Sequence, residues 1–167
     1  MNSIDLSESS RTLLANKLRR EIESASGRKA LEYRSGRFSL AEELRDCLIY
    51  LACADKFEAF PDSLKQKAET GDIFLIPDSE LGEDCYFGRF HIVYTIFGFR
   101  GIRSLVDEIM RLRRLIIKGG KIIVADYTED SFNEECIKQM KRCGFSDIRT
   151  ELFSIDGKPA FLITAEK

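Results

Sequence analysis

The chain alternates between short apolar runs and segments whose apolar residues recur at helical spacing. Leu14, Leu18 and Ile22 recur every four residues among charged neighbours, which predicts an amphipathic helix over residues 9–25. Five short apolar runs each predict a buried strand. They span residues 29–33, 47–54, 73–76, 90–96 and 121–126.

Further helices are predicted between most of these strands. They cover residues 40–46, 61–69, 102–116 and 131–143, and Gly119 and Gly120 are expected to end the third of them. Asp156 and Gly157 lie between two final β-rich runs and indicate an antiparallel hairpin. Alternating strands and helices predict an α/β three-layer sandwich with parallel crossovers, in which the last strand runs antiparallel.

Length and composition narrow the class of protein. The 167 residues suggest a single domain with a core of its own, residues 1–8 being a flexible tail. The net charge of −2, from 26 basic and 28 acidic residues, provides no general attraction for nucleic acid or anionic membranes. The first ten residues do not look like a secretory leader, and no apolar run approaches the ~18 residues of a membrane span. Five scattered cysteines without a C-x-x-C pair suggest reduced thiols in a cytoplasmic protein.

Acidic residues mark the predicted strands. Asp55, Asp78 and Asp126 follow the second, third and fifth strands, where open α/β sheets bind ligands. Each either contacts a ligand or serves the local fold, for example by capping the next helix or turn. Glu32 lies inside an apolar strand, so its carboxylate needs a partner, either a ligand or a neighbour such as Arg34.

Other chemistry is sparse. His91 is the single histidine, and no cysteine or acid stands beside it at a ligand spacing, so we expect a structural role and no metal site. Tyr94 and Thr95 either position a substrate or simply form strand, and Tyr127 is a further candidate for the same crevice. The basic residues between 100 and 118 are interpreted as a solvated helix face with Asp107 and Glu108 as partners, the alternative being a surface for RNA, a nucleotide or an acidic partner. No stacking aromatics interleave with them, which argues against single-strand binding.

Three segments in order carry a family resemblance. They are residues 90–93 (FHIV), 115–124 (LIIKGGKIIV) and 141–145 (KRCGF). With the terminal hairpin, they make the chain resemble the class I S-adenosylmethionine-dependent methyltransferases over residues 12–167. The resemblance implies a Rossmann-like sheet of seven strands in the order 3-2-1-4-5-7-6, with strand 7 antiparallel.

The resemblance also implies a cofactor, S-adenosyl-L-methionine, and a first motif that holds it. In that motif an acid and one further residue precede G-x-G-x-G. Glu32 matches the acid and Gly36 the middle glycine, whereas Arg34 and Phe38 replace the outer glycines. The motif is therefore degenerate in this chain.

The remaining cofactor contacts follow from later strands. By resemblance, Asp55 would hold the ribose hydroxyls, and Asp78 would bind the adenine amino group with Ser79 beside it. Tyr94 and Thr95 would face cofactor and substrate. No catalytic residue can be assigned from the sequence.

The replaced glycines leave two main hypotheses. Arg34 could grip the cofactor carboxylate or bind a different anion, and Phe38 could fill the cavity. The first hypothesis is a methyltransferase acting on an unidentified acceptor. The second is a catalytically inactive protein of the same fold that binds a protein partner or forms a homodimer. A nicotinamide-dependent dehydrogenase is disfavoured, because G-x-G-x-x-G is absent.

Overall fold

The computed structural model describes residues 5–56, 60–71 and 73–167. The strands are β1 (Lys29–Tyr33), β2 (Tyr50–Asp55), β3 (Phe74–Pro77), β4 (Phe90–Ile96), β5 (Ile116–Tyr127), β6 (Ser146–Ile155) and β7 (Lys158–Glu166). The α-helices are α1 (Glu8–Glu23), α2 (Ala41–Leu44), α3 (Asp62–Thr70), α4 (Leu105–Leu115) and α5 (Phe132–Arg142).

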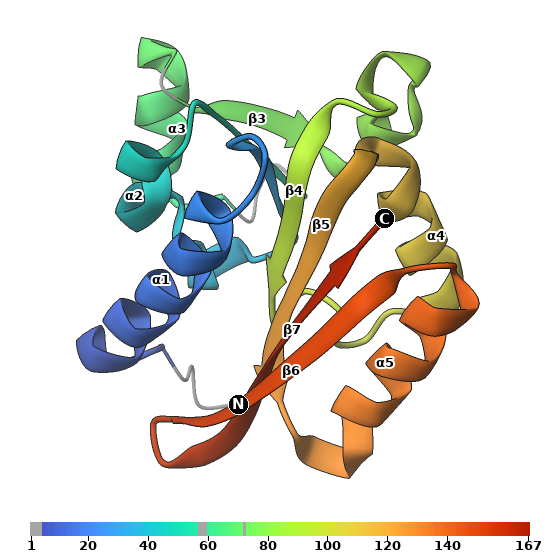
Figure 1. Ribbon diagram of the computed structural model, residues 1–167. Coiled ribbons are helices and arrows are strands. Elements are labelled where there is room, and N and C mark those ends of the chain that lie inside the picture. The colour runs from blue at the N-terminus through green and yellow to red at the C-terminus, as the bar shows by residue number, and fades with distance from the viewer. Residues whose placement is uncertain (1–4, 57–59, 72) are drawn as a thin grey trace.

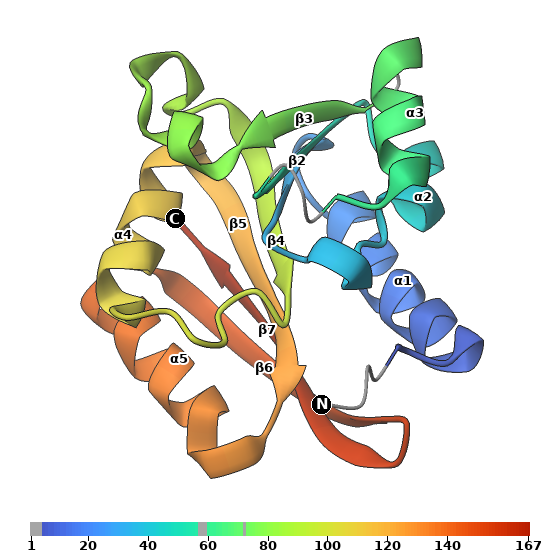
Figure 2. The same ribbon diagram turned by 180° about the vertical axis from the view of Figure 1, so that it is seen from behind.

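The strands form one seven-stranded sheet in the order β3-β2-β1-β4-β5-β7-β6. Pairing is parallel from β3 to β5, and β7 is antiparallel to both β5 and β6. Helices α1, α2 and α3 lie on one face, and α4 and α5 lie on the other (Figures 1 and 2). The predicted α/β fold, strand order and antiparallel last strand are confirmed.

Alternation along each strand builds a separate core on each face of the sheet. In β1, Ala30 packs into the core beneath α1, α2 and α3, whereas Leu31 packs into the core beneath α4 and α5. In β4, Ile92 and Val93 divide in the same way. Both faces of the sheet are therefore buried, which is why these strands appear in the sequence as continuous apolar runs.

Helix α1 begins one residue earlier than the pattern predicts. Ser7 is its N-cap and accepts a hydrogen bond from the backbone N–H of Ser10. The backbone N–H of Ser7 in turn donates to Asp156 Oδ2 at 3.2 Å, and Leu6 is buried. The predicted tail is thus wrong for residues 6–8, and residues 1–4 lie outside the described part of the chain.

The two neighbouring glycines do not end a helix. Helix α4 ends at Leu115, and Gly119 and Gly120 lie inside β5. A Cβ atom at Gly120 would stand 2.6 Å from Ile116 Cγ2 and 2.8 Å from the carbonyl oxygen of His91. Gly120 therefore serves a close approach between β5 and β4, where the pairing register shifts, and the prediction of a helix cap at the two glycines is wrong.

The described residues contain neither a membrane-spanning helix nor a cluster of metal ligands. No described helix is long and apolar enough to cross a membrane. Within the same part of the chain, no group of three or more His, Cys, Asp or Glu side chains is placed to hold a metal ion.

Candidate functional site

The turn after β1 connects three strands at their carboxyl ends. The backbone N–H of Arg34 donates to the carbonyl of Ala54, at 2.6 Å, next to the end of β2. The hydroxyl of Ser35 accepts a hydrogen bond of 3.2 Å from the backbone N–H of Ile96, the last residue of β4. These bonds fix a 3₁₀ turn, Gly36–Phe38, over the edge of the sheet where open α/β folds bind ligands.

Gly36 faces Asp55 across this edge. A Cβ atom at Gly36 would stand 3.2 Å from Asp55 Oδ2, and the backbone φ of Gly36 is +51°. Asp55 Oδ1 accepts a 2.7 Å hydrogen bond from the backbone N–H of Lys56. Oδ2 has no hydrogen-bond partner among the described residues. The structure therefore brings two of the predicted residues together and places beside a glycine a carboxylate oxygen that no described residue engages.

Asp78 is engaged elsewhere. Its carboxylate accepts a 2.8 Å ion pair from Arg111 of α4, which also bonds the Asp78 carbonyl oxygen. Arg111 pairs with Glu108 at 3.2 Å, and Glu108 accepts a 2.6 Å hydrogen bond from the hydroxyl of Tyr33. Ser79 is exposed in the 3₁₀ turn that follows β3. The acid expected to bind adenine is thus paired with a side chain of this chain.

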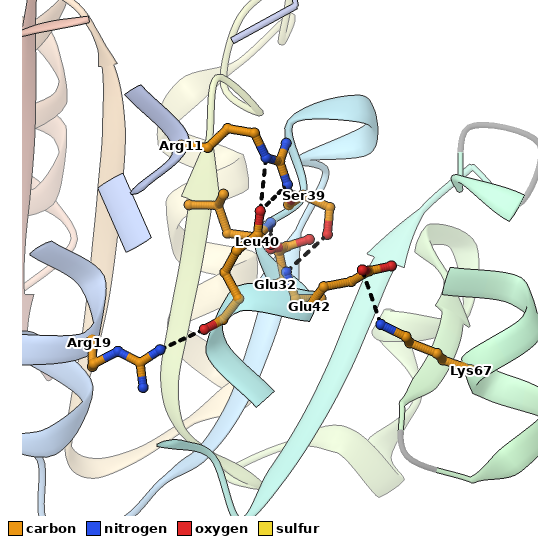
Figure 3. Close-up of polar contacts among 9 residues, drawn as sticks. Arg11, Arg19, Glu32, Ser39, Leu40, Glu42 and Lys67 are labelled. Carbon is orange, nitrogen blue, oxygen red and sulfur yellow. Dashed lines mark hydrogen bonds and ion pairs between the residues drawn. The ribbon is translucent and has the colours of Figure 1, made fainter. Parts of the chain in front are cut away.

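Glu32 is turned away from the edge and buried. It is 3% exposed, and its Oε2 accepts a 3.0 Å hydrogen bond from the backbone N–H of Leu40, just before α2 (Figure 3). The thiol of Cys53 lies 3.9 Å from Oε1. Burial raises the pKa of Glu32, and its hydrogen bonds offset only part of that effect. Its visible task is to hold the start of α2.

Helix α2 is also held from outside. Arg11 of α1 donates to the Ser39 carbonyl at 2.6 Å, and Glu42 pairs with Lys67 of α3 at 3.0 Å (Figure 3). Arg19 donates a further 2.7 Å hydrogen bond to the Glu43 carbonyl. Flanking helices thus compensate for the shortness of α2, and the turn before it is fixed at both ends.

Tyr94 and Thr95 do not reach the crevice. Both are buried within β4, where the Tyr94 hydroxyl lies near the carboxylate of Glu32 and the Thr95 hydroxyl has no hydrogen-bond partner among the described residues. Thr95 Oγ1 lies beneath Gly98, where it would be 2.1 Å from a Cβ atom. The side chain that follows β4 and lines a cavity is instead Phe97. The predicted segment is therefore displaced along the chain, because the last residues of β4 remain inside the sheet.

Three aromatic side chains form a cluster that was not predicted from the sequence, although Phe38 and Tyr127 are each candidates for the crevice on sequence grounds. Phe38 meets Phe97 edge to face, with ring centroids 4.9 Å apart, and Phe97 stacks on Tyr127 at 4.7 Å. Phe38 and Phe97 come from the loops after β1 and β4, and Tyr127 is the last residue of β5. They line a cavity of about 300 Å³ with Arg37, Arg100, Glu129 and Lys158. Two features of the sequence indicate this cluster. Phe38 stands where the family motif has a glycine, and an aromatic residue stands at or just after the end of each of these strands.

Asp126 holds two of the residues that line this cavity. It is fully buried, and its Oδ1 accepts hydrogen bonds from Arg100 Nε at 2.5 Å and from the Tyr127 backbone N–H at 2.7 Å. Burial raises the pKa of Asp126, while Arg100 opposes that shift. Arg100 is also paired with Glu129 at 2.9 Å. Asp126 therefore positions Arg100 and Tyr127 rather than facing the crevice itself.

Arg34 holds a strained backbone, with a φ of +51°. An L-residue loses roughly 1–2 kcal/mol in this left-handed region, whereas glycine adopts it freely at an entropic cost of roughly 0.5–1 kcal/mol. Replacing Arg34 with glycine is therefore expected to stabilise the protein by about 0.5–1 kcal/mol, measured by urea unfolding. Arg34→Ala, which keeps the strain, is the matched control. Equal stabilities of the two variants would show that this strain is absent.

Comparison with known proteins identifies the fold. No protein-family model matches the chain, and no curated protein matches it. A SAM-dependent methyltransferase from Archaeoglobus fulgidus superposes with a TM-score of 0.71 at 14% identity, covering 94% of this chain and 94% of that chain. One from Aquifex aeolicus has a TM-score of 0.69 at 14% identity, covering 96% and 98%.

A third similar structure is an assembly. It is a complex between the Haloferax volcanii Trm112 methyltransferase activator and a methyltransferase, with a TM-score of 0.73, 12% identity, and coverage of 95% of this chain and 90% of that chain. All three identities lie well below the level at which function follows from likeness. The chain therefore has the fold of class I S-adenosylmethionine-dependent methyltransferases.

Proposed function

We propose that the protein is an S-adenosylmethionine-dependent methyltransferase. The observation that carries the proposal is Oδ2 of Asp55, which lies beside Gly36 and is engaged by none of the described residues. A carboxylate oxygen at a strand end can accept a hydrogen bond from a ribose hydroxyl, and a glycine opposite it lets a ligand approach the backbone. These two residues fit the ribose of the cofactor.

The other residues that the sequence predicts as cofactor contacts fit that role to different degrees. Glu32 acts through Leu40, so we propose that it positions the turn rather than touching the cofactor. Arg34 lies at the same edge and has no ion pair among the described residues, which leaves it free to meet the cofactor carboxylate. Asp78 would bind the adenine amino group only on release from Arg111, and Ser79 beside it is exposed. Tyr94 and Thr95 serve the core of the sheet.

When bound, the cofactor supplies a methyl group on a sulfonium, which passes to a nucleophile by in-line displacement while sulfur keeps the electron pair of the broken bond. The chain would then have to align the methyl group with the attacking nucleophile and exclude water from the site. The fixed Gly36–Phe38 turn and the aromatic residues beyond it provide a rigid, apolar border for that task.

Ligand-induced stabilisation tests this proposal. S-adenosylmethionine or S-adenosylhomocysteine at about 100 times Kd should add ~2.7 kcal/mol, which raises the unfolding midpoint by roughly 5–10 °C at this length. NAD should have no such effect. Asp55→Asn should weaken binding about 10- to 100-fold, because a hydrogen bond to a charged group is lost. Asp62→Asn removes the same charge from an exposed position and should bind like the parent.

A second candidate function rests on Asp78. Because Arg111 already neutralises this acid, the chain could be a catalytically inactive protein of this fold that serves a protein partner or a second copy of itself. The Haloferax complex provides an example of the fold assembled with another protein. Absence of any stabilisation by the adenosyl compounds would contradict the methyltransferase and leave this candidate.

The cytoplasmic location is part of the proposal. All five cysteines are free, and four of them are buried. Unpaired thiols are typical of a reducing compartment.

A further inference from the structure

The aromatic cavity lies next to the proposed cofactor site. Gly36, which faces Asp55, and Phe38, which contacts Phe97, belong to one 3₁₀ turn. That turn separates two regions at the same edge of the sheet. One is the carboxylate of Asp55, and the other is the cavity of about 300 Å³. A ligand in the cavity would therefore lie beside a ligand held at Asp55.

Backbone strain supports a role for this cavity beyond packing. Phe97, at the centre of the aromatic wall, has a φ of +56°, a genuine outlier for a bulky residue. Its backbone N–H donates to the Ala125 carbonyl at 2.9 Å, which holds it in this conformation. Strained backbone conformations of this kind cluster at active sites and ligand-binding sites.

The charges around the cavity favour an anion. Arg37, Arg100 and Lys158 line it, against one lining carboxylate, Glu129. Arg100 is matched by Asp126 and Glu129. Arg37 and Lys158 are exposed and make no ion pair with a described carboxylate, although Lys158 helps Arg100 to lower the pKa of Glu129. Two cations at the rim are therefore available to an acidic group.

The same cations argue against a positively charged ligand. The guanidinium of Arg37 lies 4.9 Å from the centroid of the Phe38 ring. Arg100 and Lys158 each lie 5.4 Å from the centroid of the Tyr127 ring. Two of the three rings thus already carry protein cations, so a further cation would meet repulsion rather than an open aromatic face.

Size restricts the ligand further. A cavity of about 300 Å³ is at the small end of ligand sites, and three rings form much of its wall. We propose that it binds a single-ring aromatic acid, whose ring contacts Phe38, Phe97 and Tyr127 and whose acid group meets Arg37 and Lys158. That this ligand is the methyl acceptor rests on the proposed function, but its binding does not.

A titration without cofactor tests the proposal. The whole chain is titrated with 4-hydroxybenzoate, with neutral 4-hydroxybenzyl alcohol and with cationic tyramine, and binding is followed by ligand-observed NMR. We expect saturable binding of the acid, binding of the alcohol about tenfold weaker, and none of the amine. Equal affinity for acid and alcohol, preference for the amine, or no saturable binding of the acid at millimolar concentration would each overturn the proposal.

Paired variants locate the site. The double variant Arg37→Ala with Lys158→Ala should weaken binding of the acid about tenfold and reduce its salt dependence. The control is Lys118→Ala with Lys141→Ala, which removes the same charge from exposed positions outside the cavity and should bind like the parent. If both double variants lost acid affinity equally, the acid would be attracted only by the net charge of the protein, and the assignment of the site to this cavity would be overturned. If the protein bound the aromatic acid but not S-adenosylmethionine, the proposed methyltransferase function would be refuted and the proposed acid site would stand.

Discussion

Replacing Gly98 with alanine is expected to destabilise the protein by about 3 kcal/mol, the upper end of the usual cost of overpacking. A Cβ atom there would stand 2.1 Å from Thr95 Oγ1, 2.8 Å from the Tyr33 carbonyl oxygen and 3.0 Å from the Arg34 carbonyl oxygen. Two of these three atoms are backbone, so a rotamer change cannot relieve the overlap. Denaturant unfolding monitored by circular dichroism measures the loss.

Two further substitutions make this prediction specific. Gly82→Ala adds a Cβ with no atom within 4 Å and should change stability by less than about 0.5 kcal/mol. Adding Thr95→Ala to the Gly98 variant removes the nearest contact but leaves both carbonyl oxygens, so only part of the stability should return. A Gly98 variant as stable as the Gly82 variant would contradict the close approach of the two loops.

Local pattern was enough to predict the sheet. β1 and β4 lie where their mainly apolar runs begin and end, because strands buried on both faces consist mostly of apolar residues. Their order follows from the resemblance and from the short crossovers. Pattern failed at residues 116–120, because apolar residues followed by two glycines fit a helix end as well as a bulged strand. The contact that decides between them, Gly120 against His91, is made in space rather than along the chain.

The site was less predictable for the same reason. Asp55 and Gly36 could be named from the sequence, because strand ends and a tight turn are local features. The pairing of Asp78 with Arg111 joins residues 33 positions apart, and no spacing rule indicates it. The contact of Phe38 with Phe97 likewise depends on two loops meeting. Sequence thus locates the edge of the sheet that carries the site, and only the packed loops show which side chains face it.

Stability is expected to depend on pH through Glu32, and the dependence has a definite sign. Burial raises the pKa of Glu32 in the folded protein above its ordinary value of 4.5. The folded state therefore holds this proton more tightly than the unfolded state. The resulting stabilisation is fully present below pH 4.5 and is lost as the pH rises through the folded-state pKa, by at most about 1.4 kcal/mol per pH unit.

Glu32→Gln and Glu32→Ala separate this charge from the hydrogen bond to Leu40. Glutamine keeps an acceptor for the Leu40 N–H and cannot ionise, so its stability relative to the parent should increase with pH above 4.5. Alanine also cannot ionise, but it leaves that buried donor unsatisfied and opens a cavity, so it should be about 2–4 kcal/mol less stable than the glutamine variant at every pH. Urea unfolding of all three proteins across the pH range gives both quantities.

The same three proteins test how Glu32 serves the proposed cofactor site. If Glu32 acts only by holding Leu40 and the turn before α2, glutamine should preserve S-adenosylmethionine affinity and alanine should weaken it. If the carboxylate touches the cofactor, glutamine should weaken binding as much as alanine does. A parent whose stability difference from the glutamine variant stays constant across pH would contradict the buried, proton-retaining carboxyl on which both arguments depend.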